Sequence, residues 1–513
     1  MRWNWWMVLI AAVLLVPLMQ YERYAAVPAT NQPQFSHPAG NYNTDFVLRV
    51  TSPDRTAVVL LTDDGTDPTA ADVYSESIWL HGPRTAVLRA RLQWADGTLG
   101  PIVTHHYLIG LRSPIPVLSL AILPSDLWDE TRGIYTNFNQ RGADWERPAN
   151  LFLYDPAVGR GWASNHSLAI HGSDSRRLAK KSLRLYFRDA AFDPSRIIYQ
   201  NEQEVITSFF GFSPPHDFRQ LVLASGGQDS SEFGGNWTLL RDVVTDGVAR
   251  DLLGYGVRSR PVLLFINGEP WGIYYLRERF DERLLEQGLG LERPQLLDSP
   301  ALEPEPLFTP EYQAWQELLA YVNTADMSQP QALAQVAAQI DLANFIDYHI
   351  VQFYTAPADW PTLNYQFFRP DVPGGRWHWY FWDTDYALGL QPLDPAYPAS
   401  TVTSDTYSHL MEFPADQQGA AHAQLFQRLW ENDEFRTQFR TRLLTLLRTT
   451  LSPEQMEARI ETHAAALAPI IAYETGRWPQ QSRWEDNVEE LRQFARQRPL
   501  ILRQQFGMGS NEQ

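Results

Sequence analysis

Apolar residues follow a strand-like spacing near the N-terminus and a helix-like spacing near the C-terminus. This change of spacing along the chain is the sequence feature that most constrains the fold. Between residues 35 and 109, apolar residues recur in short alternating runs divided by turn residues, a pattern typical of β-strands. From residue 424 to residue 506, nearly every segment has the spacing of an amphipathic helix. Strands and helices mix between these regions: helical segments are expected at residues 239–253 and 330–354, and a β-hairpin over residues 261–276 that turns at Asn267-Gly268. We therefore predict an α+β protein, and its 513 residues exceed a single hydrophobic core, so two or more domains are expected.

The N-terminal runs predict a small β-sandwich over residues 34–110. Strands are expected at residues 46–50, 57–61, 77–80 and 86–90. Asp64-Gly65 falls at a turn position that tolerates positive φ. Many short strands at close spacing are typical of a sandwich. A second, larger domain is expected over residues 114–508, with a helical C-terminal part.

The first 30 residues have the features of an export segment. Arg2 supplies a positive charge, and residues 7–19 form an uncharged apolar run. A full membrane span needs roughly 20 apolar residues, so a signal peptide is favoured, with an uncleaved N-terminal anchor as the alternative. We expect an exported protein that is extracellular, at the cell surface, or held to the membrane through this segment only.

Composition excludes several classes of function. The formal net charge of −18 argues against a nucleic-acid partner. The absence of cysteine excludes disulfides, thiolate metal sites and cysteine nucleophiles. The sequence also lacks the G-x-x-x-x-G-K-[ST], G-x-S-x-G and H-E-x-x-H motifs of common NTPases, hydrolases and zinc proteases.

Chemistry is most strongly indicated between residues 355 and 390. Asp359 precedes Asn364 by five residues, a predicted β-hairpin follows over residues 365–382, and Asp383-Thr384-Asp385 comes directly after it. Protein kinases order their catalytic Asp, metal-binding Asn, hairpin and metal-binding Asp in this way. The first carboxylate receives the proton of the attacking hydroxyl, while the amide and second carboxylate hold the metal on the phosphates.

The same residues allow two other interpretations. Asp359 to Asn364 is also a plausible helix-ending turn, and Asp383 and Asp385 are then the polar end of a strand. A D-x-D motif also serves metal-dependent glycosyltransferases, which bind nucleotide sugars.

Several ordered motifs resemble the CotH family of atypical protein kinases. Residues 170–187 (IHGSDSRRLAKKSLRLYF) are similar to the family element RGxSSRxxxKKSxxxxF, and residues 265–278 match NGExxGxYxLxE. Residues 344–348 follow in the family order, and after them come two acidic turns. The first acidic turn is residues 359–364, and the second is residues 383–385. His171 stands where the family motif has Arg. The N-terminal segment, through residues 35–42, 61–69 and 104–107, resembles the small Ig-like sandwich module at the C-terminal end of chitobiases and hexosaminidases, and this resemblance implies an Ig-like β-sandwich.

The family resemblance implies a two-lobed kinase-like domain that uses ATP and Mg²⁺ or Mn²⁺. Gly172 and Ser173 would approach the phosphates closely, because small residues permit this. The other implied roles are Asp359 as the base, Asn364, Asp383 and Asp385 on the metal, and Arg176, Lys181 and Glu278 around the nucleotide.

The phosphate-binding lysine and its partner are less well determined. Lys181 is favoured over Lys180, because alternation places Lys181, Leu183 and Leu185 on one face of a strand. Its partner carboxylate is Glu278, Asp229 or Asp242, which the sequence does not distinguish.

Two functions follow as hypotheses. The first is an atypical kinase that transfers the ATP γ-phosphate to Ser or Thr of a protein substrate. The second is a non-catalytic surface or spore-coat-like scaffold, whose sandwich binds glycans or partners.

Overall fold

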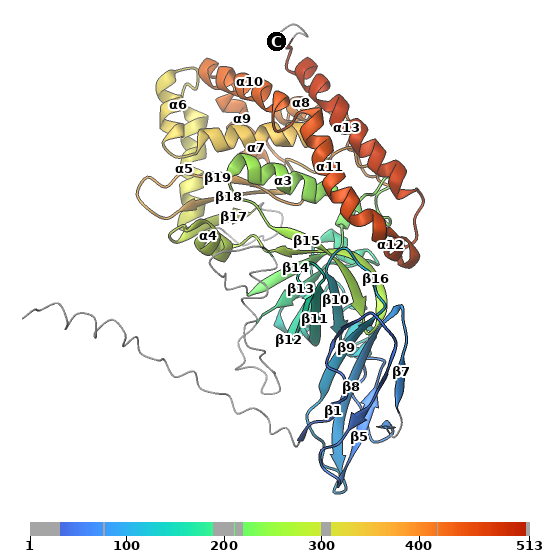
Figure 1. The fold of residues 1–513 in the computed structure, drawn as a ribbon. Coiled ribbons are helices and arrows are strands. Elements are labelled where there is room, and N and C mark those ends of the chain that lie inside the picture. The colour runs from blue at the N-terminus through green and yellow to red at the C-terminus, as the bar shows by residue number, and fades with distance from the viewer. Residues whose placement is uncertain are drawn as a thin grey trace, which may run out of the picture.

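The computed structural model describes residues 31–74, 77–187, 210, 219–298, 309–417 and 419–508. Figure 1 shows three successive parts along the chain: N-terminal sheets, a central closed sheet and a largely helical C-terminal part. The α+β class is therefore confirmed. The predicted export segment, residues 1–30, lies outside the described residues. No helix within the described ranges is long and apolar enough to cross a membrane.

The N-terminal part consists of β-strands that pack around a core of their own. A five-stranded sheet has the order β2-β9-β8-β5-β6, and β3 pairs with β7 in a second sheet. Leu48 and Leu80 of the second sheet share a buried cluster with Leu88, Leu92 and Tyr107 of the first, so the two sheets pack face to face. The strands are β1 (Gln34–Phe35), β2 (Gly40–Tyr42), β3 (Phe46–Leu48), β4 (Val50–Thr51), β5 (Ala57–Thr62), β6 (Val73–Tyr74), β7 (Ile78–Leu80), β8 (Arg84–Trp94) and β9 (Val103–Ile109).

The central part is a closed sheet of seven strands in the order β10-β11-β12-β13-β14-β16-β15. Alternate residues such as Leu183, Leu185, Leu221 and Leu223 point inward and fill its interior. The opposite faces of β13 and β14 are therefore free to line a site. The strands are β10 (Val117–Ala121), β11 (Arg147–Asp155), β12 (Arg160–Ile170), β13 (Leu183–Tyr186), β14 (Gln220–Ala224), β15 (Ser259–Ile266) and β16 (Glu269–Glu278).

Polar contacts fasten the N-terminal sheets to the closed sheet. The predicted hairpin turn at Asn267-Gly268 is confirmed, with φ of 49° and 87° at these residues, and the Gly268 carbonyl accepts a hydrogen bond from Thr85 Oγ1 at 2.6 Å. His106 of β9 is fully buried between Ser119 Oγ and Asn150 Oδ1, each 2.8 Å from a ring nitrogen. Burial lowers its pKa to about 4, so the ring is neutral at physiological pH.

The C-terminal part packs helices around a three-stranded sheet. Its sheet has the order β17-β18-β19, formed by β17 (Pro294–Asp298), β18 (Tyr365–Pro370) and β19 (His378–Phe381). The helices of the described chain are α1 (Pro124–Trp128), α3 (Arg241–Leu253), α4 (Glu282–Leu289), α5 (Pro310–Thr324), α6 (Pro330–Ala337), α7 (Leu342–Thr355), α8 (Thr406–Met411), α9 (Ala420–Leu429), α10 (Asp433–Arg448), α11 (Pro453–Leu467), α12 (Ile471–Arg477) and α13 (Trp484–Gln505). Short 3-10 turns occur at η3 (Ala143–Trp145), η4 (Asp174–Arg177), η6 (Gly227–Asp229) and η7 (Ala468–Ile470).

The helices expected at residues 239–253 and after residue 424 are confirmed. The segment 330–354 is helical as expected, and the structure divides it into two helices, α6 and α7. Asp341 explains the break, because its carboxylate caps the second helix by accepting a hydrogen bond from the Asn344 N–H at 3.0 Å.

A buried ion pair joins the closed sheet to α12. Lys180 Nζ donates to Glu474 Oε1 at 2.7 Å and to the Ile273 carbonyl at 2.8 Å. Glu474 Oε2 accepts from the Ile273 N–H at 2.7 Å. Lys180 and Glu474 are 2% and 1% exposed, so each charge depends on the other for compensation.

Replacing Lys180 by Met should destabilise the protein strongly. The substitution leaves the Glu474 carboxylate buried and unpaired, which costs about 3–5 kcal/mol. Urea unfolding followed by circular dichroism measures the loss. Arg436→Met is the control, because its partner Asp433 is 93% exposed and such surface pairs contribute at most about 1 kcal/mol. Equal losses in the two variants would contradict the prediction, and Lys180→Met with Glu474→Gln should recover part of the loss.

Candidate active site

A cavity of about 1190 Å³ lies between the outer face of the closed sheet and the C-terminal part. Its wall contains eight of the nine residues that the sequence singled out: Gly172, Ser173, Arg176, Glu278, Asp359, Asn364, Asp383 and Asp385. The ninth, Lys181, is not in the wall. Residues separated by more than 200 positions in the sequence thus meet at one place.

The two acidic turns are joined by a side-chain amide. Asn364 Nδ2 donates to Asp359 Oδ2 at 2.7 Å and to the Asp383 carbonyl at 3.4 Å. Asn364 and Asp383 adopt positive φ, 60° and 55°, which Asn and Asp tolerate better than most residues. The D-x-x-x-x-N spacing therefore brings the first turn against the second.

Asp359 has the properties of a proton acceptor. Its Oδ1 atom is buried without a hydrogen-bond partner among the described residues. Burial, with a further contribution from the nearby charge of Asp383, raises the pKa of Asp359 to about 7. A carboxyl group with such a pKa exchanges a proton readily near neutral pH.

Asp385 is held by the loop before α3. Its Oδ2 accepts a hydrogen bond from the Gln228 N–H at 2.8 Å. Gly227 has a φ of +52°, and a Cβ atom there would lie 2.1 Å from the same oxygen, so only glycine allows this approach. Burial and then the charges of Asp383 and Asp242 raise the pKa of Asp385.

The middle residue of the second acidic turn is tethered to α3. Asp242 Oδ1 accepts hydrogen bonds from the Thr384 N–H and hydroxyl, at 3.1 and 3.0 Å. Arg277 of β16 pairs with Asp242 and, at 3.2 Å, with Asp246. Sheet, helix and acidic turn are therefore linked through one carboxylate.

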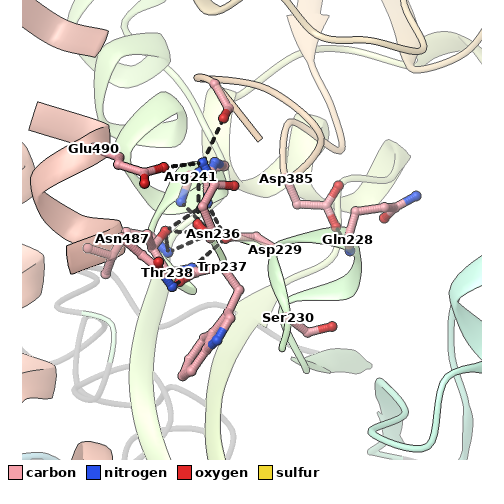
Figure 2. A network of polar contacts seen from close by, with 12 residues as sticks. Gln228, Asp229, Ser230, Asn236, Trp237, Thr238, Arg241, Asp385, Asn487 and Glu490 are labelled. Atoms are coloured by element: carbon pink, nitrogen blue, oxygen red, sulfur yellow. Dashed lines mark hydrogen bonds and ion pairs between the residues drawn. The ribbon is translucent and has the colours of Figure 1, made fainter. Parts of the chain in front are cut away.

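Asp229 anchors the loop Gly226-Gly227-Gln228 that precedes it (Figure 2). Its carboxylate accepts from the N–H groups of Thr238, Leu240 and Arg241 at 2.6, 2.9 and 3.0 Å, and it pairs with the Arg241 guanidinium. These contacts satisfy donors at the start of α3. The side chain of Asn487 of α13 donates to the Trp237 carbonyl at 2.9 Å, which extends the network to the C-terminal helix.

Lys181 does not face the cavity, and its predicted place was wrong. Its Nζ donates to the carbonyls of Arg176 and Leu178, at 2.6 and 2.7 Å, and lies 4.4 Å from the centre of the Phe138 ring. The alternation that groups it with Leu183 and Leu185 is correct, but those leucines face the interior of the closed sheet. The other face of β13 lines the cavity, and the sequence signal for it was the run of polar residues at 182, 184 and 186.

Neither Lys180 nor Lys181 pairs with a predicted partner. Asp229 binds Arg241, and Asp242 binds Arg277. Glu278 accepts from the Arg258 N–H at 2.7 Å, its Oε1 has no hydrogen bond within the described chain, and burial raises its pKa to about 7.

Arg176 lines the cavity but uses its guanidinium for the fold. It donates to the carbonyls of Gly172, Phe138, Gln140 and Ile170, at 2.7, 2.6, 3.0 and 2.5 Å. These bonds shape the loop that carries Gly172 and Ser173. Arg176 therefore stabilises this loop, and its guanidinium is already occupied by backbone carbonyls.

The oxygen atoms of the acidic turns suit a hard divalent cation. Asp383, Asp385 and Asn364 offer carboxylate and amide oxygens, the ligands that Mg²⁺ and similar ions prefer. Within the described residues, no three His, Cys, Asp or Glu side chains are grouped to hold a metal ion unaided. An ion held here would take its remaining ligands from water and a bound phosphate, as Mg²⁺ commonly does.

Comparison with known families agrees with this geometry. A family model described as CotH kinase protein matches residues 168–502, which include both acidic turns and most of the cavity wall. No curated protein matches the chain.

Replacing Glu278 by Gln should flatten part of the pH dependence of stability. With a pKa of about 7 in place of 4.5, Glu278 loses its proton at a higher pH in the folded than in the unfolded protein, so stability falls as pH rises between these values. Ionisation inside the fold costs on the order of 3 kcal/mol above pH 7. Urea unfolding at pH 5 and pH 8 should therefore show a smaller difference for Glu278→Gln than for the wild type. An unchanged difference would mean that this carboxyl ionises normally.

Proposed function

The chain belongs to the CotH kinase family, and we propose that it transfers the γ-phosphate of ATP to Ser or Thr of a protein substrate. The observation that carries the proposal is the meeting of Asp359, Asn364 and Asp383 at one end of a large cavity. In phosphoryl transfer, positioning and electrostatic stabilisation supply most of the catalysis. This cavity offers a proton acceptor, metal-binding oxygens and facing cations for that purpose.

Asp359 acts as the proton acceptor in this mechanism. Its carboxylate receives the proton of the substrate hydroxyl, while the Asn364 amide orients that carboxylate through its hydrogen bond to Oδ2. Asn364, Asp383 and Asp385 would hold Mg²⁺ or Mn²⁺. The bound ion supplies charge neutralisation on the phosphates.

The loops around the cavity keep these groups in place. Gln228 restrains Asp385, and Asp242 restrains Thr384, so the second acidic turn is held from two directions. Gly172 and Ser173 close the cavity from the closed sheet. We propose that the closed sheet serves as the smaller lobe of a kinase-like arrangement and the helical part as the larger lobe.

A non-catalytic scaffold is the alternative function. Trp79 and Val47, paired across β7 and β3, are 56% and 42% exposed and form an apolar spot on the N-terminal sheets. Such an aromatic surface suits binding of a glycan or a protein partner. This alternative requires no nucleotide in the cavity, so nucleotide binding separates it from the kinase proposal.

Asp383→Asn should weaken the binding of Mg-ATP or Mn-ATP at least about tenfold, because it removes a charged metal ligand. Isothermal titration calorimetry of the full chain measures this. Asp359→Asn should keep nucleotide binding but slow transfer to a protein acceptor about 10²- to 10⁴-fold, because it removes only the base. Asp371→Asn, in the hairpin turn after β18 and 50% exposed, is the matched control.

The outcomes distinguish the hypotheses. Wild-type protein that binds no nucleotide with either metal supports the scaffold. Binding of a nucleotide sugar in preference to ATP would support the glycosyltransferase interpretation and overturn the kinase proposal.

Gly227→Ala should also weaken metal-nucleotide binding, because the added methyl group displaces Asp385. Gly290→Ala is a matched control: its φ of +66° is similar, but a Cβ atom there meets nothing within 4 Å. Both variants carry backbone strain, and only Gly227→Ala disturbs the site. Equal affinities in the two variants would show that Asp385 contributes nothing to binding.

A further inference from the structure

The cavity-facing side of the closed sheet carries a set of arginines that the predicted site did not include. Arg184 of β13, Arg277 of β16 and Arg279, which follows β16, all line the cavity. In the sheet, Arg184 pairs with Val222 and Val222 pairs with Arg277, so one row runs across three strands. Val222 and its neighbour Ala224 are small, which leaves room for a ligand above the sheet.

The cations of this row differ in their partners. Arg277 is neutralised by Asp242 and Asp246. Within the described chain, no ion pair joins Arg184 or Arg279 to a carboxylate. Arg279 Nη1 donates to Gln220 Oε1 at 2.9 Å, and Arg184 Nε is buried without a hydrogen-bond acceptor.

His171 adds no positive charge to this wall. Arg184 Nη2 lies 2.8 Å from His171 Nδ1, and since a guanidinium only donates, the imidazole nitrogen accepts. Burial and the surrounding arginines hold the pKa of His171 well below its usual value, so the ring is neutral. Arg184 thereby places a guanidinium beside the position where the family motif has Arg.

A bound anion would offset the like charges of Arg184 and Arg279 in this half-buried wall. Burial, followed by the charge of Arg279, lowers the pKa of Arg184, because each disfavours the charged guanidinium. Guanidinium groups bind phosphate oxygens through paired N–H donors and stay charged when desolvated. Arg277 lies beside the metal-binding turn, while Arg184 lies two strands away, about 10 Å across the sheet at the usual strand spacing.

We propose that Arg184 and Arg279 bind the phosphates of the nucleotide, in the role that a lysine serves in other kinases. The assignment rests on the proposed kinase function for the identity of the nucleotide. The anion site itself depends only on Arg184 and Arg279, which together are called the arginine wall. Lys180 and Lys181 are committed to Glu474 and to backbone carbonyls, so the phosphate contacts fall to these arginines.

Calorimetric titration of the full chain with inorganic tripolyphosphate in EDTA tests the wall without metal or adenine. Arg184→Gln and Arg279→Gln should each weaken binding at least about tenfold, and Arg184→Lys should fall between, because it keeps the charge but loses the paired donors. Arg160→Gln, at an exposed position on β12, is the control and should bind as the wild type does. Circular dichroism verifies that each variant is folded.

Asp383→Asn separates this proposal from the kinase proposal. It should retain tripolyphosphate binding in EDTA even if the chain never binds metal-ATP. Wild-type affinity in both Arg→Gln variants, or no tripolyphosphate binding by the wild type, would overturn the arginine assignment. The same variants are also titrated with O-phosphoserine. If Arg184→Gln and Arg279→Gln lose O-phosphoserine binding but keep tripolyphosphate binding, these arginines bind the phosphorylated product, and the nucleotide assignment is overturned.

Discussion

The buried pair of Asp229 and Arg241 is the interaction on which the site depends. One carboxylate satisfies the first N–H groups of α3 and fixes the loop that carries Gly227 and Gln228. That loop in turn restrains Asp385, while α3 presents Asp242 to Thr384. A buried charge is tolerated only when it is paired and hydrogen-bonded, so this arrangement has little freedom to shift. The acidic turn is therefore placed by the fold before any ligand arrives.

Negative and positive side chains line opposite sides of the cavity. Carboxylates gather on the turns that follow α7 and β19, and burial together with their mutual repulsion raises the pKa of Asp359 and Asp385. Guanidiniums without carboxylate partners in the described chain gather on the sheet opposite. Each group is unfavourable alone, and a metal-bound polyphosphate would satisfy both, since it presents a cation to the first and phosphate oxygens to the second.

The sequence predicted what depends on local patterns and ordered motifs. The α+β class, the Asn267-Gly268 hairpin and the acidic turns are local, and the structure contains each of them. The position of Lys181 failed because alternation identifies two faces of a strand without showing which one packs inward. Lys180 and Glu474 are separated by 294 positions, and no local pattern reports such a contact. Arg184 and Arg279 become a pair only when β13, β14 and β16 align.

Anomalous diffraction from crystals grown with Mn²⁺ and a non-hydrolysable ATP analogue tests the central claim most directly. The account predicts a manganese peak bound by oxygens of Asp383 and Asn364, with the phosphates running from that ion toward Arg184. A nucleotide bound elsewhere, or manganese located away from both acidic turns, would contradict it.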